Sequence, residues 1–262
     1  MQNDRPQVMG IVNVTPDSFS DGGRFYSPAQ ALDQARCLID AGADGLDIGG
    51  ESTRPGAQAV GEQEELERIL PVLEGLRHCG VPVSVDTMKP AVMRAALAAG
   101  AAMINDVRAL QAQGALEAVR DSDCAVCLMH MQGEPRRMQD APQYRDVLNE
   151  VYDFLATRIA ACEAAGIARS RLCIDPGFGF GKTLEHNLTL LRGLPRLAEL
   201  APVLVGVSRK RMIGEITGRS VEDRLAGSVA AALRAVEKGA SIVRVHDVAA
   251  TVDALKIWER TR

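Results

Sequence analysis

The residues of this chain best suited to chemistry stand where short apolar runs end. Such a run stops at a polar residue or polar cluster eight times along the sequence, at Asn13, Asp47 to Arg54, Asp86, Asn105, His130, Asp175, Ser208 to Arg211 and His246. Within the second cluster, Thr53 supplies a hydroxyl donor and Arg54 a positively charged fork, a pair that suits a phosphate group. These residue types favour a site for a polar substrate that carries negative charge.

The apolar runs themselves have the composition of parallel strands buried on both faces. They cover residues 8–12, 45–48, 81–85, 102–104, 125–129, 172–174, 203–207 and 242–245. In α/β folds, ligands bind at the carboxyl ends of such strands. If the runs are neighbouring strands, the polar residues that follow them share one rim.

Helical patterns alternate with these strands. We predict helices over residues 28–41, 61–79, 90–99, 112–121, 143–165, 184–194, 221–238 and 249–260. Strand followed by helix, eight times in 262 residues, predicts one α/β domain over residues 1–262 that forms a closed (β/α)8 TIM barrel. The main alternative is an open doubly wound sheet, which more often has five or six strands.

Two connections are longer than is needed to join a strand to a helix. One follows the first strand, from Asn13 to Gly23, and the other follows the second, from Gly49 to Gly56. Both carry hydroxyl, carboxylate, Pro and Gly residues, which also make ordinary turns. Because long loops at the carboxyl rim of a barrel are commonly lids or binding elements, we expect both to contribute to the site.

Composition excludes several functional classes. The net charge of −4 and the pI near 5.7 give no basic surface for nucleic acid. No apolar stretch approaches the length of a membrane span, and residues 1–6 lack the features of a signal peptide, so we expect a cytoplasmic protein with no membrane partner.

Two motifs resemble a metal site and a nucleotide-binding loop, but their residue spacing argues against both interpretations. Cys124 and Cys127 form a CxxC sequence, but positions three apart in a strand point to opposite faces, so we expect buried, reduced thiols and no metal site. Residues 177–183 resemble a P-loop, but the first glycine lies one residue too close to the Gly-Lys-Thr end, and we do not expect ATP binding.

The polar strand ends belong to longer motifs that occur in a fixed order. They read MGIVNVTPDSFSDGG at 9–23, DIGGESTRPG at 47–56, SVDT at 84–87, IND at 104–106, IDPGFGFGK at 174–182, SRK at 208–210 and RVH at 244–246. This ordered set resembles the bacterial dihydropteroate synthases of folate biosynthesis. It spans nearly the whole chain and falls on seven of the eight predicted strand ends.

The resemblance implies a single pterin-binding (β/α)8 barrel that acts as a transferase of the EC 2.5.1 class. Such an enzyme joins p-aminobenzoate to 6-hydroxymethyl-7,8-dihydropterin diphosphate and releases diphosphate and 7,8-dihydropteroate. It works with Mg²⁺, usually as a homodimer, and sulfonamides inhibit the family. The predicted helices over 184–194 and 221–238 are rich enough in Ala and Leu to bury a face against a second copy.

By resemblance, one group of residues recognises the pterin. Asp175 would accept from its amino and ring N–H groups, Asn105 and Lys210 would complete the edge, and Asp86 would lie near the reacting carbon. The catalytic residues would be Asp86, Asp175 and Lys210. Helix capping is the alternative for both aspartates, because Pro90 and Pro176 follow them closely.

A second group would bind the diphosphate, and its members are Asn13, Thr53, Arg54, Arg244 and His246. Asn13 would also be the protein's ligand to Mg²⁺, a hard cation that prefers oxygen. Arg244 and His246 lie two residues apart, so in a strand both side chains point to one face and can meet one anion.

The third group would hold p-aminobenzoate. Ser208, Lys210 and the backbone of Arg211 would bind its carboxylate, and Pro55 and Phe180 would flank its ring. The family often has Ser in place of Arg211, so the chain departs from the pattern there. His130 matches no family role, and we interpret it as structural.

The resemblance implies an SN1-like substitution at the pterin methylene, with no enzyme nucleophile. Three other functions remain as alternatives: a corrinoid-dependent methyltransferase with a related pterin barrel, a Schiff-base aldolase that uses Lys210, and a catalytically silent pterin-binding protein. The methyltransferase would not need the long loop after Asn13, and the aldolase would be trapped by borohydride.

Overall fold

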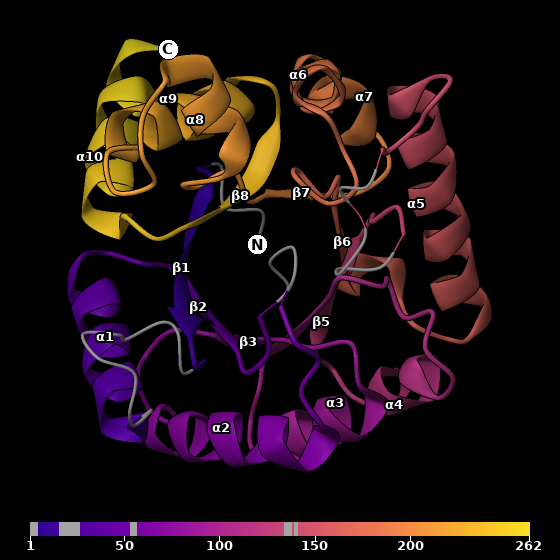
Figure 1. Ribbon diagram of the computed structural model, residues 1–262. Coiled ribbons are helices and arrows are strands. Elements are labelled where there is room, and N and C mark those ends of the chain that lie inside the picture. Colours follow the sequence, from indigo (N-terminus) through magenta and orange to yellow (C-terminus); the bar gives the residue numbers. More distant parts are fainter. Residues whose placement is uncertain (1–4, 16–26, 53–56, 134–137, 139–140) are drawn as a thin grey trace.

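Eight parallel strands close into a barrel in the computed structural model, which describes residues 5–15, 27–52, 57–133, 138 and 141–262 (Figure 1). The strands pair in chain order, and β1 also pairs with β8 to complete the ring. Their bounds are β1 (Gln7–Asn13), β2 (Gly45–Gly49), β3 (Val83–Asp86), β4 (Met103–Asp106), β5 (Ala125–Met129), β6 (Leu172–Asp175), β7 (Val203–Val205) and β8 (Ala240–Val245). The predicted TIM barrel is confirmed.

The helices form an outer layer around this ring (Figure 1). They are α1 (Pro28–Asp40), α2 (Glu62–Gly75), α3 (Pro90–Ala98), α4 (Ala115–Arg120), α5 (Val147–Ala164), α6 (Leu184–Arg192), α7 (Leu194–Leu197), α8 (Arg211–Thr217), α9 (Leu225–Glu237) and α10 (Val248–Thr261). In α1, Ala31, Ala35 and Leu38 recur at helical spacing and are buried. The helices therefore cover the barrel with apolar stripes.

Several predicted element boundaries were wrong, and three of them have clear local reasons. The helix predicted from residue 143 begins at Val147, because the carboxylate of Asp146 accepts a hydrogen bond from the backbone N–H of Asn149 (3.0 Å) and caps it. The strand predicted over 81–85 begins at Val83, after Pro82, which has no N–H for a ladder. The helix predicted over 221–238 begins at Leu225, and the seven-residue α8 before it was too short to show a periodicity.

Side chains along the strands alternate between the outside and the inside of the barrel. Val8, Leu46 and Val126 belong to the layer between sheet and helices. A smaller cluster fills the inside of the barrel, formed by Met9, Met103, Cys127, Cys173 and Leu204. We call this cluster the inner plug.

The CxxC residues follow this alternation. Cys124 packs in the outer layer and Cys127 in the inner plug, and both are buried free thiols, as predicted. Across the described residues, no group of three or more His, Cys, Asp or Glu side chains could hold a metal ion. In the same part of the chain, none of the helices is both long enough and apolar enough to cross a membrane.

Candidate active site at the carboxyl rim

The guanidinium of Arg244 joins three strands at the carboxyl end of the barrel. Its Nε donates to Asp47 Oδ2 on β2 (2.5 Å), and its Nη2 donates to Asp86 Oδ2 on β3 (3.3 Å). The side chain of Asp47 is fully buried, and those of Asp86 and Arg244 are 13% and 19% exposed. Two carboxylates and one cation are therefore held together beneath the rim.

Asp47 also orients Asn105, a residue predicted to bind pterin. The Nδ2 of Asn105 donates to Asp47 Oδ2 (3.2 Å), so the amide oxygen of Asn105 is left as an acceptor. Oδ1 of Asn105 and Oδ1 of Asp47 are buried, and neither has a hydrogen-bond partner among the described residues. Buried acceptors of this kind are suited to N–H groups of a ligand.

In the sequence, Asp47 was one of the polar residues at which an apolar run ends, and no role was predicted for it. One signal was available: Asp47 stands between Leu46 and Ile48, which pack outward, so its carboxylate had to face the inside of the barrel. A buried carboxylate needs a cationic or hydrogen-bonding partner. Arg244 and Asn105 are those partners.

Burial changes the ionisation of Asp86. It raises the pKa of this carboxyl to about 7; the charge of Arg244 opposes the shift, and Asp47 adds to it. The pKa of Arg244 is raised despite its burial, because Asp47 and Asp86 stabilise the cation. Asp86 therefore changes its charge near neutral pH beside a group that remains positive.

Asp175 and Lys210 also influence each other's charge at the rim. Burial raises the pKa of Asp175, and the charge of Lys210 opposes that shift. Burial lowers the pKa of Lys210 to about 8 against the attraction of Asp175. The Nζ of Lys210 donates to the carbonyl of Phe178 (2.6 Å) and lies 4.8 Å from the ring centroid of Phe180, within cation–π range.

Neither predicted aspartate is a helix cap. Asp175 accepts from the backbone N–H of Gly177 (2.7 Å) in the turn after β6, and the N-cap of α6 is Thr183. The N-cap residue of α3 is Lys89, three residues beyond Asp86. The capping alternative is therefore wrong for both carboxylates.

Ser208 and His246 were predicted to serve different substrates, but they are in contact. The Oγ of Ser208 lies 3.0 Å from Nδ1 of His246 and accepts from the backbone N–H of His246 (3.2 Å). The side chain of Arg211, the first residue of α8, is 80% exposed, and its Nε donates to Glu215 (2.5 Å). The backbone of Arg211 is therefore better suited than its side chain to bind a carboxylate.

Asn13 ends β1 on the same rim. A β-carbon added to Gly49 would lie 4.0 Å from the Asn13 side-chain oxygen and 3.7 Å from the β-carbon of Asp86, so these two side chains flank Gly49. Thr53, Arg54 and Pro55 lie outside the described residues, as does the greater part of the long loop after Asn13.

His130 has the contacts of a packed side chain. Its Nδ1 lies 3.0 Å from Nζ of the buried Lys182, and its ring meets that of Phe154 edge to face at 4.9 Å. Burial and the charge of Lys182 lower the pKa of His130 to about 3. Lys182 also donates to the carbonyls of His130 and Phe180, so it fastens the segment after β6 to the end of β5.

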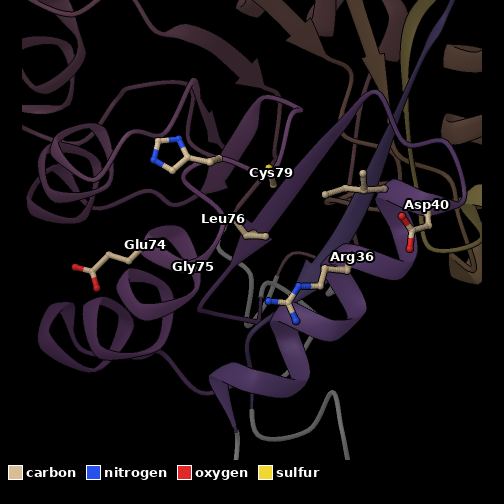
Figure 2. Close-up of a pocket in the computed structure, with 8 residues that line it drawn as sticks. Arg36, Asp40, Glu74, Gly75, Leu76 and Cys79 are labelled. Carbon is tan, nitrogen blue, oxygen red and sulfur yellow. The ribbon is translucent and has the colours of Figure 1, made fainter.

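Two cavities lie away from the rim. One of about 350 Å³ is bordered by Arg36 and Asp40 of α1 and by residues from Glu74 to Cys79 at the end of α2 (Figure 2). The other, of about 240 Å³, lies at the amino-terminal mouth of the barrel, below the inner plug. Neither is lined by a residue predicted to bind substrate.

Comparisons with known proteins give matches over nearly the whole chain. A family model described as pterin binding enzyme matches residues 9–246. The chain is 57% identical to a dihydropteroate synthase of Neisseria meningitidis serogroup C over 262 residues, which cover 98% of this chain and 93% of that protein.

Two solved structures of the Xanthomonas albilineans dihydropteroate synthase each match 98% of this chain. The structure with 4-aminobenzoic acid has a TM-score of 0.93 at 60% sequence identity, and 93% of that chain is covered. The structure in complex with 7,8-dihydropteroate has a TM-score of 0.89 at 56% identity, and 94% of that chain is covered.

Proposed function

The chain belongs to the dihydropteroate synthase family of pterin binding enzymes, and from this membership we propose how its residues share the work of the reaction. It is a transferase that condenses 6-hydroxymethyl-7,8-dihydropterin diphosphate with p-aminobenzoate to give 7,8-dihydropteroate and diphosphate. Contacts at the rim support the role proposed for each described residue.

Asp175, Asn105 and Lys210 bind the pterin ring. Asp175 keeps one carboxylate oxygen for ligand N–H groups while its other oxygen accepts from Gly177. Asn105 presents its amide oxygen, because its NH₂ group is committed to Asp47. Lys210 adds a donor whose pKa is close enough to neutral for it to exchange a proton with a ring nitrogen.

The substitution at the pterin methylene is SN1-like. The C–O bond breaks, its electron pair leaves with the diphosphate, and the dihydropterin nitrogen delocalises the positive charge left on the carbon. The ionised carboxylate of Asp86 stabilises this cation across the ring. The amine of p-aminobenzoate then donates its electron pair to the carbon and loses a proton.

The diphosphate end of the site uses Arg244 and His246 from β8, Asn13 from β1, and Thr53 and Arg54. Arg244 is held in place by Asp47 and Asp86 and has further N–H donors for an anion. The amide oxygen of Asn13 fits Mg²⁺, which binds through few protein oxygens and completes its shell with water and phosphate. When bound, the ion neutralises negative charge that develops on the diphosphate.

p-Aminobenzoate lies against Phe180, with its carboxylate near Ser208, Lys210 and the backbone N–H of Arg211. The cation–π contact of Lys210 with Phe180 supports this placement, because it joins the pterin end to the aromatic end of the site. Pro55 would complete the ring contact from the segment after β2.

We further infer a cytoplasmic homodimer. Exposed apolar side chains support a partner surface on the last helices: Ile216 of α8, Leu225 of α9 and Ile257 of α10 are 56%, 44% and 68% exposed. Light scattering should give the mass of a dimer for the protein and a lower mass for Ile257→Lys. A monomeric wild type would contradict the proposed assembly.

The observation that carries the catalytic assignment is a connected group at the rim, in which Asp47 accepts from Asn105 and Arg244, and Arg244 also donates to Asp86. The test is formation of 7,8-dihydropteroate from the diphosphate ester, p-aminobenzoate and Mg²⁺, with and without a chelator. Diphosphate release that depends on p-aminobenzoate and on the metal is the expected result. Release that ignores p-aminobenzoate would contradict the coupled substitution, and unchanged turnover in the chelator would contradict the role of Mg²⁺.

A further inference from the structure

A buried lysine that the proposed reaction does not use lies in the connection between β6 and α6, residues 176–183. Lys182 is only 3% exposed. Its Nζ lies 3.0 Å from Nδ1 of His130 and donates to the backbone carbonyls of His130 (3.3 Å) and Phe180 (3.0 Å). His130 directly follows β5, so this one amine joins the end of β5 to the residue proposed to lie against p-aminobenzoate.

These contacts satisfy the lysine in either ionisation state. Burial lowers the pKa of Lys182 to about 7, against the attraction of Asp175. The pKa of His130 is lowered to about 3, so its imidazole is neutral. A charged amine can donate to Nδ1 and to both carbonyls, whereas an uncharged amine can donate to both carbonyls and accept from an N–H at Nδ1. The link between β5 and Phe180 therefore holds on both sides of neutral pH.

The connection between β6 and α6 lies directly on the segment that follows β5. Gly177 and Gly181 both have positive φ, at 70° and 63°. A β-carbon on Gly177 would overlap the carbonyl oxygen of His130, and one on Gly181 would overlap that of the nearby Gln132. Close backbone packing therefore holds the connection on both sides of Phe180.

The ring of Phe180 depends on this backbone for its position. Phe178 is fully buried in the core, whereas Phe180 is only partly buried, so apolar packing holds the second ring less firmly than the first. The backbone N–H of Phe180 donates to the carbonyl of Gly177 (3.1 Å), and its own carbonyl accepts from Lys182 (3.0 Å). Because the backbone sets the direction of the Cα–Cβ bond, these two hydrogen bonds help to fix the ring.

We propose that Lys182 is a positioning residue for p-aminobenzoate. By holding the carbonyl of Phe180 to the end of β5, it places the ring at the rim, where the Nζ of Lys210 lies 4.8 Å from the ring centroid. Lys182 contacts His130 and Phe180, and it acts on the substrate through Phe180. The inference rests on the role proposed for Phe180 against the ring of p-aminobenzoate.

Steady-state kinetics of dihydropteroate formation test the proposal. Lys182→Met keeps an unbranched apolar side chain and removes the three hydrogen-bonding contacts. KM for p-aminobenzoate should rise by up to about tenfold, the size of one misplaced aromatic contact, while KM for the dihydropterin diphosphate should stay unchanged. The assay is run at about pH 8.5, where a lysine with a pKa of about 7 is largely uncharged, so its loss leaves the charge near Asp175 nearly the same. Lys256→Met, which replaces an exposed lysine paired with Asp253, is the matched control.

A double-variant cycle with Phe180→Leu distinguishes positioning from general damage. Phe180→Leu should itself raise KM for p-aminobenzoate. In that background Lys182→Met should add nothing further, because its effect passes through the ring. Additive effects of the two changes would overturn the proposal, as would equal increases in KM for both substrates.

The variants also separate failure of the inference from failure of the proposed function. If Phe180→Leu raises KM for p-aminobenzoate while folded Lys182→Met has the wild-type value, the positioning role is wrong and the assignment of Phe180 stands. If Phe180→Leu has no effect, that assignment fails, and the inference built on it fails too. Lys182→Gln, whose side chain is one bond shorter, replaces Lys182→Met if that variant does not fold, and the same outcomes decide the result.

Discussion

The burial of Asp86 should lower the stability of the folded protein near neutral pH, where its carboxylate is proposed to act in catalysis. Its pKa rises from an ordinary value of 3.8 to about 7 on folding, chiefly because its carboxyl is buried. The folded state therefore keeps a proton that the unfolded chain releases between about pH 4 and pH 7, so stability falls as pH rises through that window. A shift of this size corresponds to about 4 kcal/mol once the group is ionised in both states.

The change that tests this is Asp86→Asn, which removes the charge and keeps the shape. The free energy of unfolding of both proteins is measured by urea titration at intervals from pH 4 to pH 8. The variant should gain about 4 kcal/mol relative to the wild type across this range, and its synthase activity should be nearly abolished. The difference between the two curves matters, because other groups that titrate independently cancel in it.

The attraction of Arg244 for the ionised Asp86 opposes the effect of burial, so the stability difference between the two proteins shows which effect is larger. If its attraction balanced the burial of Asp86, the carboxyl would ionise normally, and the two stability curves would run parallel. If its attraction dominated more strongly, the wild type would gain stability relative to Asp86→Asn as pH rises. Either outcome refutes the reasoning that burial governs the ionisation of Asp86.

Three further changes probe other parts of the site. Asp175→Ala should lower kcat/KM for dihydropteroate formation by about 100-fold or more, as deletions of comparable electrostatic groups do, and near-normal turnover would end the pterin assignment. Asp47→Asn removes a charge that raises the pKa of Asp86, so the acid limb of kcat/KM against pH should move to lower pH; an unmoved limb would contradict that coupling. Arg211→Ala should change KM for p-aminobenzoate by no more than about fivefold, because the side chain is exposed and paired with Glu215, and a larger effect would place its guanidinium on the substrate.

The barrel could be predicted from the sequence because its strands carry two signals at once. In β6, Leu172 to Ile174 read as a buried strand, and Asp175 marks the end where ligands collect. The same logic placed Asp86 and Asn105 on the rim, and the structure has both there. The local sequence pattern was therefore sufficient to predict the position of a residue that depends on a single strand.

Contacts between strands were not predictable in this way. The pairing of Ser208 with His246 joins residues 38 positions apart, and that of Asp47 with Arg244 joins residues 197 apart. No spacing rule connects them, because their distance depends on how the barrel closes. Asp47 lacked a role for this reason: its partners come from strands that become its neighbours only across the inside of the ring.

The shifted ionisations at the rim depend on the apolar floor beneath them. On β6, Cys173 and Asp175 point to the same face, two residues apart, so the inner plug lies directly below the carboxylate. Met9, Met103, Cys127 and Leu204 make up the rest of the inner plug, which is apolar. Charges above such a floor are poorly solvated from below, which raises the pKa of Asp86 and lowers that of Lys210. We therefore expect that without the plug Asp86 and Lys210 would titrate closer to their ordinary values and lose their nearness to neutral pH.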